Sequence, residues 1–366
     1  FFIFAGSLMN NAGITERIFN FAKALMGWMR GGLGHVNVGA SIVFSGMSGA
    51  AVADAGGLGM IEVKAMKDAG YDEEFAVGIT AASSTIGPII PPSLPMVIYG
   101  VMASTSVGQL FAAGVVPGLL MGLMLMSMIF LISRRRGYTA DARFSFGVLG
   151  RTFGQAFLSL MTPVIIVGGI LTGAFTPTES AVAAVVYALL LGVVVYRTLT
   201  WRKLLKVSME TIETTAIILF IVGAASIFAW ILSSNQVTQN LVALMGPFAD
   251  NKIAVLMFSN IVLIIVGCFM ETIAAITILV PVLLPMAIAV GVDPVHFGVI
   301  MVLNLMIGLL TPPVGMVLYV LSRVSNVSFE RCMHGTIPFL IPLVFCLLLV
   351  TFIPAISMWL PTLIYR

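Results

Sequence analysis

Two short stretches decide the fold. The sequence carries IGPIIPPS at residues 86–93 and IGLLTPP at residues 307–313, called here the first break and the second break. Each places a Pro-Pro pair inside a long apolar region. Proline removes a backbone donor and clashes with the carbonyl one turn back, so neither stretch suits the interior of a regular helix. Freed backbone groups need protein or a cavity around them in a bilayer. The two stretches therefore predict two broken helices inside the protein.

The composition around the breaks indicates a protein embedded in a lipid bilayer. Of the 366 residues, 60% are apolar and only 9% are charged, and the mean hydropathy is +1.11. Soluble domains are about one quarter charged, which excludes an ordinary soluble fold. The net charge of +3 also excludes a nucleic-acid-binding chain. The three cysteines show neither a metal-binding nor a disulfide pattern.

Several stretches are long and apolar enough to cross a bilayer as helices. They are residues 112–133, 152–173, 178–197, 214–232 and 336–360, and residues 1–13 have the character of the end of another. Two short amphipathic segments, 14–30 and 201–213, predict helices lying on the membrane surface. The expected fold class is an all-α polytopic membrane protein.

The positions of Lys and Arg indicate the orientation of the chain. Suppose that residues 33–61 and 252–290 form re-entrant hairpins, each leaving the membrane on the side that it entered. All but two of the 18 Lys and Arg then fall on one side, and the exceptions are Lys252 and Arg366. Treating either hairpin as a full crossing scrambles this division. The charges therefore favour two re-entrant hairpins and assign the basic side to the cytoplasm.

The two breaks belong to an internal repeat. Shifting the chain by 221 residues places Gly70 on Gly291 and the first Pro-Pro pair on the second. By the charge division the first hairpin opens from the cytoplasm and the second from outside, so the copies are inverted. Inverted repeats with matching broken helices mark secondary transporters, whose substrate lies between the repeats. Completing the first copy needs about two more helices, roughly 60 residues, so we expect a longer protein that extends before residue 1.

This interpretation divides the chain into six parts. They are the end of a scaffold helix with an interfacial arm helix (1–32), the first transport-domain repeat (33–110), scaffold and connecting helices (111–200), an arm helix with a scaffold helix (201–251), the second transport-domain repeat (252–323) and a final transmembrane helix (324–366). Each transport-domain repeat contains one re-entrant hairpin and one broken helix.

Each repeat supplies a hairpin tip and a break that suit a cation. The first tip comprises residues 45–49 and the second tip residues 267–272. Carbonyls near a break lose their helical partners, and together with hydroxyl or amide oxygens they suit a dehydrated Na⁺. A structural kink capped by Ser and Thr is the alternative for one break alone. Two breaks at matching positions of a repeat favour the cation site.

Three carboxylates lie nearest to the apolar stretches. A buried carboxylate in a membrane is costly and usually functional. Asp54 and Glu271 lie close to the tips, where they can bind a cation, accept a proton or orient the tips. A cap or a local polar contact is the alternative for Asp54. Glu179 lies at the expected start of a helix, where Thr176 or Thr178 can cap and Glu179 meets the positive helix end.

An anionic substrate would have to be held without buried cations, because no Lys or Arg lies mid-membrane in this interpretation. Helix N-termini, hydroxyls and co-bound Na⁺ remain as binding groups. Four half-helices can aim their positive ends inward. They are expected to begin near Gly49, Ser93, Thr272 and Val314.

Two other classes of function remain open at this point. Residues 46–49 read GMSG, which matches the nucleophile motif of an intramembrane serine protease, but a base must reach the serine. His35 lies on the opposite hairpin arm, and His296 and His334 lie near the expected membrane edges. An inverted repeat would have no purpose in a protease. A passive channel is the second alternative, and a transporter rather than an enzyme is favoured over both.

Over essentially its whole length, the chain resembles the large membrane subunit of the TRAP (tripartite ATP-independent periplasmic) transporters, the DctM-like subunit. The most specific parts are GITER (13–17), GHVNV (34–38), FSGMSG (44–49), ADAGGLG (53–59), the first break, TPTE (176–179) and GLLTPP (308–313). The first half is especially similar to sialic-acid members, so sialic acid is favoured slightly over a C4-dicarboxylate.

The resemblance implies Na⁺-driven uptake of an organic acid anion across a bacterial inner membrane. It implies two partners, a small membrane subunit and a periplasmic substrate-binding protein, and an elevator in which a transport domain moves against a scaffold. The implied sodium ligands are Ser45, Gly46, Ser48, Gly87 and Pro91 in the first repeat and Gly267, Thr272, Gly308 and Thr311 in the second. The implied substrate site lies between the tips, with Ser48, Asp54, Ser83, Ser93, Glu271 and Asn304 as its candidates.

Overall fold

The structure, a computed structural model, describes residues 1–236 and 251–365, without the side chains of residues 46–48, 229 and 233. This part of the chain is almost entirely helical and contains no strand, apart from one isolated bridge between Arg30 and Ala140. Seven of its helices are long and apolar enough to cross a membrane. They are α8 (Val107–Arg136), α9 (Phe146–Leu171), α10 (Pro177–Leu189) with its π-helical continuation η1 (Leu190–Val195), α11 (Trp201–Ser234), α13 (Lys252–Gly267), α14 (Thr272–Ala289) and α17 (Phe329–Phe352). The predicted all-α polytopic fold is confirmed.

The two segments that carry the breaks have the same order of elements. The first segment runs through α3 (Gly32–Ser48), α4 (Ala51–Gly56), α5 (Leu58–Asp68), α6 (Glu73–Ser84) and α7 (Leu94–Met102). The second runs through α13, α14, α15 (Pro294–Gly308) and α16 (Met316–Ser325). In both, two hairpin arms precede a helix that stops at a break, and a short helix follows. The Pro-Pro bond of each break is cis.

Matching caps start the helices that lead into the breaks. Asp72 caps α6 by accepting from the Glu74 N–H, and Asp293 caps α15 by accepting from the Val295 and His296 N–H groups. Each carboxylate also places negative charge at a positive helix end. The paired aspartates of the repeat thus have the same local role in both segments.

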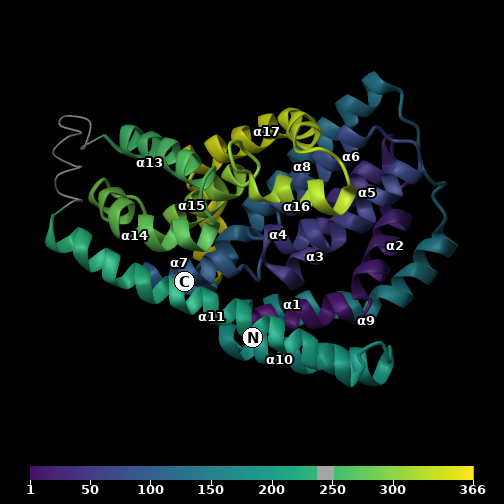
Figure 1. The fold of residues 1–366 in the computed structure, drawn as a ribbon, viewed down its shortest axis with the longest axis horizontal. Helices are drawn as coiled ribbons and strands as arrows, with labels where there is room; N and C mark the ends of the chain where they lie inside the picture. The colour runs from purple at the N-terminus through teal and green to yellow at the C-terminus, as the bar shows by residue number, and fades with distance from the viewer. Residues whose placement is uncertain (237–250, 366) are drawn as a thin grey trace.

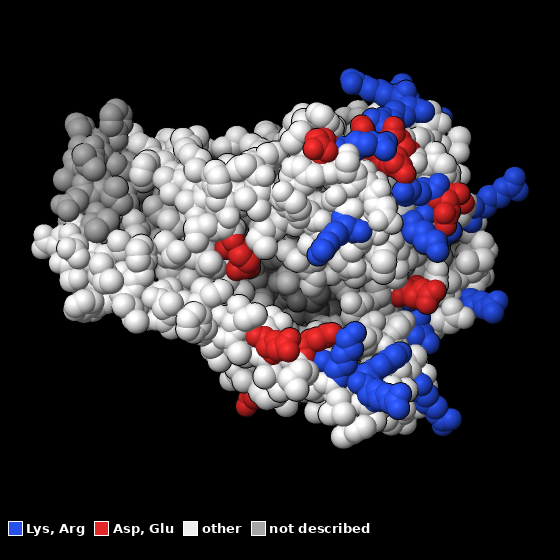
Figure 2. All heavy atoms as spheres, in the orientation of Figure 1, with Lys and Arg blue, Asp and Glu red and all other residues white. Residues whose placement is uncertain are grey.

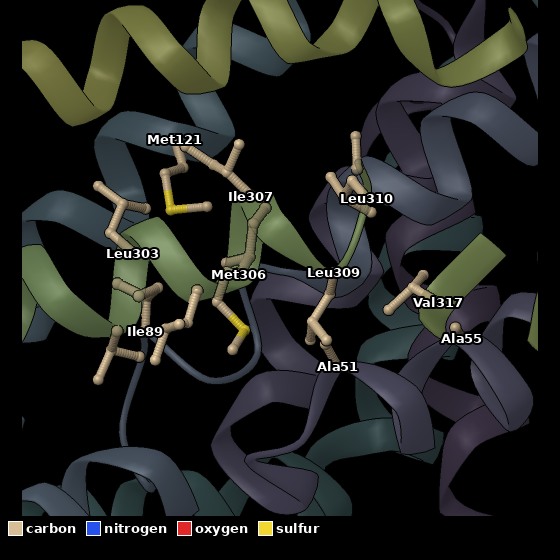
Figure 3. Close-up of a cluster of buried hydrophobic side chains, with 14 of the residues drawn as sticks. Ala51, Ala55, Ile89, Met121, Leu303, Met306, Ile307, Leu309, Leu310 and Val317 are labelled. Atoms are coloured by element: carbon tan, nitrogen blue, oxygen red, sulfur yellow. The ribbon is translucent and has the colours of Figure 1, made fainter. Parts of the chain in front are cut away.

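The two segments exchange contacts across the middle of the molecule. The short helix α7 of the first packs on the hairpin arm α14 of the second, and α16 of the second packs on α4 and α5 of the first. Figure 1 shows the two segments side by side, with α17 covering them on one side. Residues of both breaks belong to one buried apolar cluster, in which Ile89 of the first break lies beside Met306 of the second segment (Figure 3).

A second group of helices borders these segments. It comprises α1 (Phe2–Asn11), α2 (Ile14–Met26), α9, α10 and α11, and α10 and α11 lie along the lower edge of the molecule in Figure 1. Helix α1 packs on α3, α10 and α11, and α2 packs on α3 and α9. The short α18 (Ala355–Ile364) packs on α8.

The structure corrects two expected boundaries. Residues 201–213 do not form a separate surface helix, because α11 runs without interruption from Trp201 to Ser234. Its hydroxyl residues do not break it, since Thr211 and Thr214 each donate to the carbonyl one turn back. The expected final helix over 336–360 is also divided, because α17 ends at Phe352 and α18 begins after Pro354. Part of the expected scaffold segment 201–251 lies outside the described residues.

The expected amphipathic helix near the start of the chain is present as α2. Ile14, Ile18 and Ala22 are buried against neighbouring helices. Leu25 and Trp28 are exposed. The C-terminal part of this segment therefore presents apolar side chains outward.

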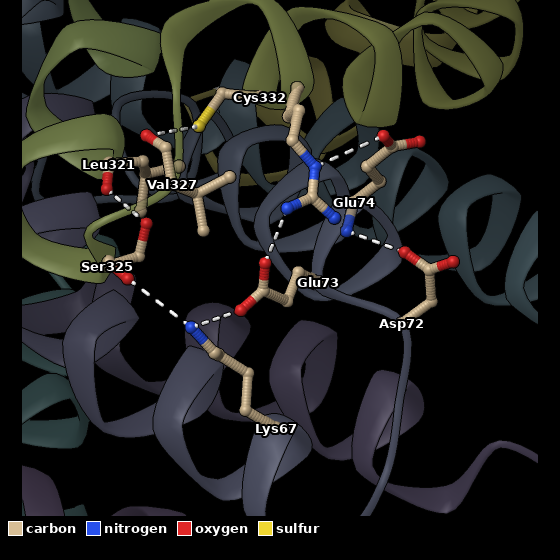
Figure 4. A network of polar contacts seen from close by, with 9 residues as sticks. Lys67, Asp72, Glu73, Glu74, Leu321, Ser325, Val327 and Cys332 are labelled. Atoms are coloured by element: carbon tan, nitrogen blue, oxygen red, sulfur yellow. Dashed lines mark hydrogen bonds and ion pairs between the residues drawn. The ribbon is translucent and has the colours of Figure 1, made fainter.

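Lys and Arg gather at one end of the molecule (Figure 2), as the predicted one-sided charge distribution requires. At this charged end, Lys67 of α5 and Arg331 of α17 both bind Glu73 of α6, each at 2.7 Å (Figure 4). Arg331 also approaches Glu74 at 3.4 Å. This ionic network joins helices that are far apart in the sequence.

Candidate functional site

Each hairpin tip bonds to the break of its own segment. The residue that follows the first break, Leu94, donates its N–H to the carbonyl of Gly49 in the first tip, at 3.4 Å. The residue that follows the second break, Val314, donates its N–H to the carbonyl of Cys268 in the second tip, at 3.2 Å. The same arrangement of tip and break is therefore built twice.

Glycines permit this close approach. Gly49 has φ +62°, and a Cβ there would lie 2.5 Å from the Pro92 carbonyl oxygen. In the second segment Gly267 faces Gly308, where an added Cβ would lie 2.6 Å from the Gly267 Cα. Glycine is the residue that fits both the left-handed backbone and such backbone contacts. Gly267 and Gly308, both candidate sodium ligands, are thus in direct contact.

A cavity of about 480 Å³ lies between the residues that directly follow the first tip, Ala50 to Val52, and the end of the second tip, Glu271 and Thr272. It is lined from both segments, by residues such as Val52, Pro88 and Leu309, and by one face of α11 that includes Thr214 and Ile218. A smaller cavity of about 210 Å³ shares Ala50, Leu94 and Thr214 with it. The face drawn in Figure 2 is hollowed near its middle. The larger cavity falls within the range of small-molecule sites.

Four helices begin at this cavity. Helices α4, α7, α14 and α16 start at Ala51, Leu94, Thr272 and Met316, and all four residues line it. These starts lie within two residues of the four predicted positions. Unsatisfied N–H groups and the helix dipole make each helix start a region of positive potential. Among the described residues that line the cavity there is no Lys or Arg.

Two hydroxyl groups at the candidate cation sites donate hydrogen bonds to backbone carbonyls. Ser45 Oγ donates to the Ile42 carbonyl at 2.5 Å, and Thr311 Oγ1 donates to the Ile307 carbonyl at 2.8 Å. A hydroxyl oxygen used in this way keeps its lone pairs for another partner. Thr272 Oγ1 is buried and has no hydrogen-bond partner within the described part of the chain. These oxygens are suited to a cation.

The two carboxylates near the tips have different surroundings. Glu271 lines the cavity and caps α14, because its Oε2 accepts from the Ile273 and Ala274 N–H groups at 2.7 and 3.2 Å. Its negative charge opposes an anion and favours a cation. Asp54 is buried in α4, and its carboxylate lies against Gly87, where an added Cβ would meet Oδ2 at 2.2 Å. Asp54 thus connects the first hairpin to the first break.

Three other substrate candidates lie away from the cavity wall. Ser83 Oγ donates to Asn37 Oδ1 at 2.5 Å, and Asn304 Nδ2 donates to Asn260 Oδ1 at 2.8 Å. Ser83 and Asn304 match each other under the 221-residue shift, so each ties a broken helix to the first arm of its own hairpin. Ser93 is buried at the start of α7, where its hydroxyl donates to the Pro88 carbonyl and accepts from the Met96 N–H.

The remaining candidates are backbone positions or lie outside the description. Pro91 is buried in the first break and forms the cis bond with Pro92. Gly46 and Ser48 belong to the last turn of α3, and the side chain of Ser48 lies outside the described part of the structure. Of the substrate and sodium candidates, Glu271 and Thr272 are the two that line the larger cavity.

The sequence did not point to three polar residues of this region. Asn37 and Asn260 brace the broken helices, and Thr214 brings α11 to the cavity wall. A lone asparagine within an apolar run was the available signal for Asn260, since amides in membrane helices seek partners. No local pattern marks Thr214, because its role depends on where α11 packs.

The expected structural role of Glu179 at the start of α10 is confirmed, with Thr176 as the N-cap. Thr176 Oγ1 accepts from the Glu179 N–H at 3.3 Å, and Glu179 Oε2 accepts from the Thr176 N–H at 2.8 Å. This reciprocal pair is a capping box at the start of α10. The capping box therefore explains the role of Glu179, which is not among the residues that line the larger cavity.

Comparison with known proteins places this geometry among transporters. The chain is 51% identical to the sialic acid TRAP transporter large permease protein SiaM of Vibrio cholerae, over 99% of this chain and 85% of that protein. It is 44% identical to the sialic acid TRAP transporter permease protein SiaT of Haemophilus influenzae (100% and 59%) and 40% identical to the C4-dicarboxylate TRAP transporter large permease protein DctM of Pseudomonas aeruginosa (99% and 84%).

The fold is also similar to a solved structure, that of the Alcanivorax borkumensis YdaH transporter. The TM-score is 0.65 at 14% identity, and the match covers 98% of this chain and 85% of that chain. At this identity the likeness concerns the fold alone. These relatives are transporters and not enzymes, so the serine protease and the passive channel are not favoured.

The family model of the tripartite ATP-independent periplasmic transporter, DctM component, matches residues 1–356. Together with the seven helices that are long and apolar enough to span a bilayer, this match indicates a multi-pass protein of the bacterial inner membrane. The chain belongs to the DctM family, the large permease component of the tripartite ATP-independent periplasmic transporters.

Proposed function

We propose that this permease carries an organic acid anion inward across the membrane, coupled to Na⁺. The observation that carries the proposal is the convergence of four helix starts, α4, α7, α14 and α16, on one cavity without Lys or Arg. Helix N-termini bind carboxylates through free N–H groups and the helix dipole. Glu271 already caps α14 and Ser93 already caps α7, so the starts of α4 and α16 remain for the anion.

Bound Na⁺ would supply the positive charge that the side chains lining the cavity do not provide. Two sites are proposed, one at Ser45 and the first break and one at Thr272, Thr311 and the second break, where tip and break are held together. Hydroxyl oxygens and carbonyls released from helices are suitable ligands for Na⁺. The Glu271 carboxylate attracts cations to the second site. Bound cations would in turn offset the charge of the substrate.

Sialic acid is the first substrate to test, and a C4-dicarboxylate is the second. Two relatives named for sialic acid are 51% and 44% identical to this chain, against 40% for one named for C4-dicarboxylates. The tripartite family description supports two partners, a small membrane subunit and a periplasmic substrate-binding protein. In this proposal the periplasmic protein delivers the anion to the cavity.

An elevator is the mechanism that we propose for transport. The segments with the breaks exchange contacts across the cavity, whereas the cavity's last wall comes from α11, outside these segments. Movement of the paired segments against α11 would carry the site from one side of the membrane to the other. Inverted repeats give two such arrangements of similar energy.

The test is uptake into proteoliposomes that contain the full-length permease, the small membrane subunit and the periplasmic protein. Radiolabelled sialic acid and succinate are supplied separately, with and without an inward Na⁺ gradient. We expect uptake of sialic acid that depends on the gradient. Equal uptake with K⁺ replacing Na⁺ would contradict sodium coupling. Uptake of succinate instead would contradict the choice of substrate, and uptake of neither by sealed, assembled vesicles would contradict both.

A further inference from the structure

A polar cavity lies at the charged end, away from the site described above. Its volume is about 280 Å³, and it separates the C-terminal half of α2 from the start of α9. Two cations line it, Lys23 of α2 and Arg143 before α9. Asn20, Ser145, Thr152 and Gln155 add hydroxyl and amide groups to its wall.

The cavity carries uncompensated positive charge. Neither Lys23 nor Arg143 forms an ion pair within residues 1–236 and 251–365. The carboxylate closest to Arg143 in sequence, Asp141, is engaged elsewhere: its Oδ2 accepts from the Leu33 N–H at 2.8 Å and from the Tyr71 hydroxyl at 2.5 Å. The two cations are therefore available to an anion.

The start of α9 adds to this potential. Ser145 is the N-cap of this 26-residue helix, and its side chain makes no capping hydrogen bond. The first N–H groups of α9 thus keep their capacity to donate, and the helix dipole places partial positive charge beside Arg143. The hydroxyl of Thr152 is occupied, because it donates to the Val148 carbonyl at 2.9 Å.

Exposed aromatic side chains are neighbours in the sequence of residues that line the polar cavity, as Phe144 is of Arg143 and Phe153 of Thr152. Trp28 and Phe144 are 51% and 43% exposed, with ring centroids 6.1 Å apart, and Phe144 contacts Phe146 at 4.9 Å. Along α9, Phe153 and Phe157 continue the exposed apolar surface and contact each other. Tryptophan is enriched at the level where headgroups meet acyl chains, and the phenylalanine rings extend the apolar surface beside Trp28. A polar cavity beside such a surface suits a molecule that is anionic at one end and apolar at the other.

We propose that this cavity binds the headgroup of an anionic phospholipid, with phosphatidylglycerol as the probe. Lys23, Arg143 and the start of α9 face its phosphate, Asn20 and Gln155 offer hydrogen bonds to its glycerol hydroxyls, and Phe153 and Phe157 contact an acyl chain. Basic pockets between membrane helices on the cytoplasmic side are suited to such headgroups. A free phosphate would use the cations but not the apolar surface.

Brominated lipids test the proposal, because bromine quenches nearby tryptophan. Trp28 lies just beyond the end of α2, four residues after Ala24, which lines the cavity. The full-length protein is prepared in nanodiscs with Trp28 as its sole tryptophan, which within this sequence requires W201F, W230F and W359F. We expect brominated phosphatidylglycerol to quench Trp28 at a lower mole fraction than brominated phosphatidylcholine. Each cation near an anionic lipid contributes about fivefold to this preference.

Two double variants distinguish lipid binding in this cavity from a general attraction of anionic lipids to the charged end. Lys23→Gln with Arg143→Gln should remove most of the preference, about 25-fold for two cations. Arg134→Gln with Arg135→Gln removes the same charge from the exposed end of α8, outside the cavity, and should leave the preference intact. An equal loss of the preference for phosphatidylglycerol in the two double variants would overturn the proposal. Equal quenching by the two lipids in the parent protein would also overturn it.

Two further measurements test whether free phosphate or protein occupies the cavity in place of lipid. Inorganic phosphate in millimolar excess should not remove the preference for phosphatidylglycerol. Loss of the preference would show a site for free phosphate and overturn the assignment to lipid. The measurement is then repeated on the assembly with the small membrane subunit. Quenching that disappears there would mean that protein covers the cavity, which would also overturn the proposal.

Discussion

At the scale of single residues, glycines allow the tips to lie against the breaks. The backbones approach each other too closely at these positions for a side chain to fit. Gly49 combines a left-handed backbone with a carbonyl 2.5 Å from where a Cβ would lie. Gly70 has φ +82° as well, but nothing lies within 4 Å of its Cβ position. Substitutions at these two glycines therefore distinguish the effect of the left-handed backbone from the effect of the close contact with Pro92.

We expect Gly49→Ala to destabilise the protein more than Gly70→Ala does. Both variants place alanine in the left-handed region, at about 1–2 kcal/mol. Only Gly49→Ala also forces the first tip away from the Pro92 carbonyl. Thermal unfolding of the purified protein should show a larger decrease in Tm for Gly49→Ala. Equal decreases would contradict the close contact of tip and break.

Ser45→Ala and Thr311→Ala should each weaken the dependence of uptake on Na⁺ without affecting membrane insertion. Each variant removes one oxygen whose lone pairs are left free by its donated hydrogen bond. The expected change is a severalfold higher Na⁺ concentration for half-maximal uptake. Thr336→Ala is the matched control, because Thr336 is buried and donates in the same way, to Cys332 in α17. Unchanged Na⁺ activation in both variants would exclude these oxygens as ligands.

At the scale of elements, local signals decided where several helices begin, and tertiary packing decided how far they continue. Thr176 and Glu179 start α10 through a capping box that is complete within four residues. By contrast, α11 passes through the position where a surface helix was expected to end. Nothing in residues 201–213 breaks a helix, so the change from amphipathic to apolar sequence leaves α11 uninterrupted.

Thr176→Ala should destabilise the protein by about 1 kcal/mol, the usual effect of removing an N-cap hydroxyl. Transport by the folded variant should be unchanged, because Thr176 does not line the larger cavity. The measurements are thermal unfolding and uptake normalised to inserted protein. Thr178→Ala serves as the control, since Thr178 follows the cap and takes no part in the capping box. Lost transport from a stable Thr176→Ala protein would contradict the structural role.

At the scale of the whole molecule, ion pairs at the charged end join the first segment to α17. Lys67, Glu73 and Arg331 come from α5, α6 and α17, and the network is solvent-accessible (Figure 4). The hydrogen bond and charge of Lys67 hold the pKa of Glu73 below its usual value of 4.5, and Arg331 acts in the same direction. A carboxyl with a lowered pKa stabilises the folded state above its unfolded pKa.

Glu73→Gln should therefore lower the Tm slightly at pH 7. Below about pH 4.5 the difference from the parent protein should shrink, because the contribution is lost as the pH falls through the lowered pKa of Glu73. Thermal unfolding across this pH range is the measurement. Glu330→Gln, a neighbour of Arg331 that is in no ion pair of the described chain, is the control. A difference that stays constant down to acidic pH would contradict the network.

The sequence by itself determined the class of protein, the two breaks and the four helix starts at the cavity. These features depend on local physics: apolar length, the missing N–H of proline and the capping of helix ends. The charge distribution likewise predicted one basic end, because the positions of Lys and Arg can be counted along the chain.

Only the tertiary structure decided which polar groups meet. Ser83 and Asn304 bind asparagines on the hairpin arms instead of lining the cavity, while Thr214 of α11 reaches it. The cavity between α2 and α9 likewise joins Lys23 to Arg143, which are 120 residues apart. Such pairs are fixed by how helices pack and rotate against each other, and neither composition nor periodicity records the contact between distant elements.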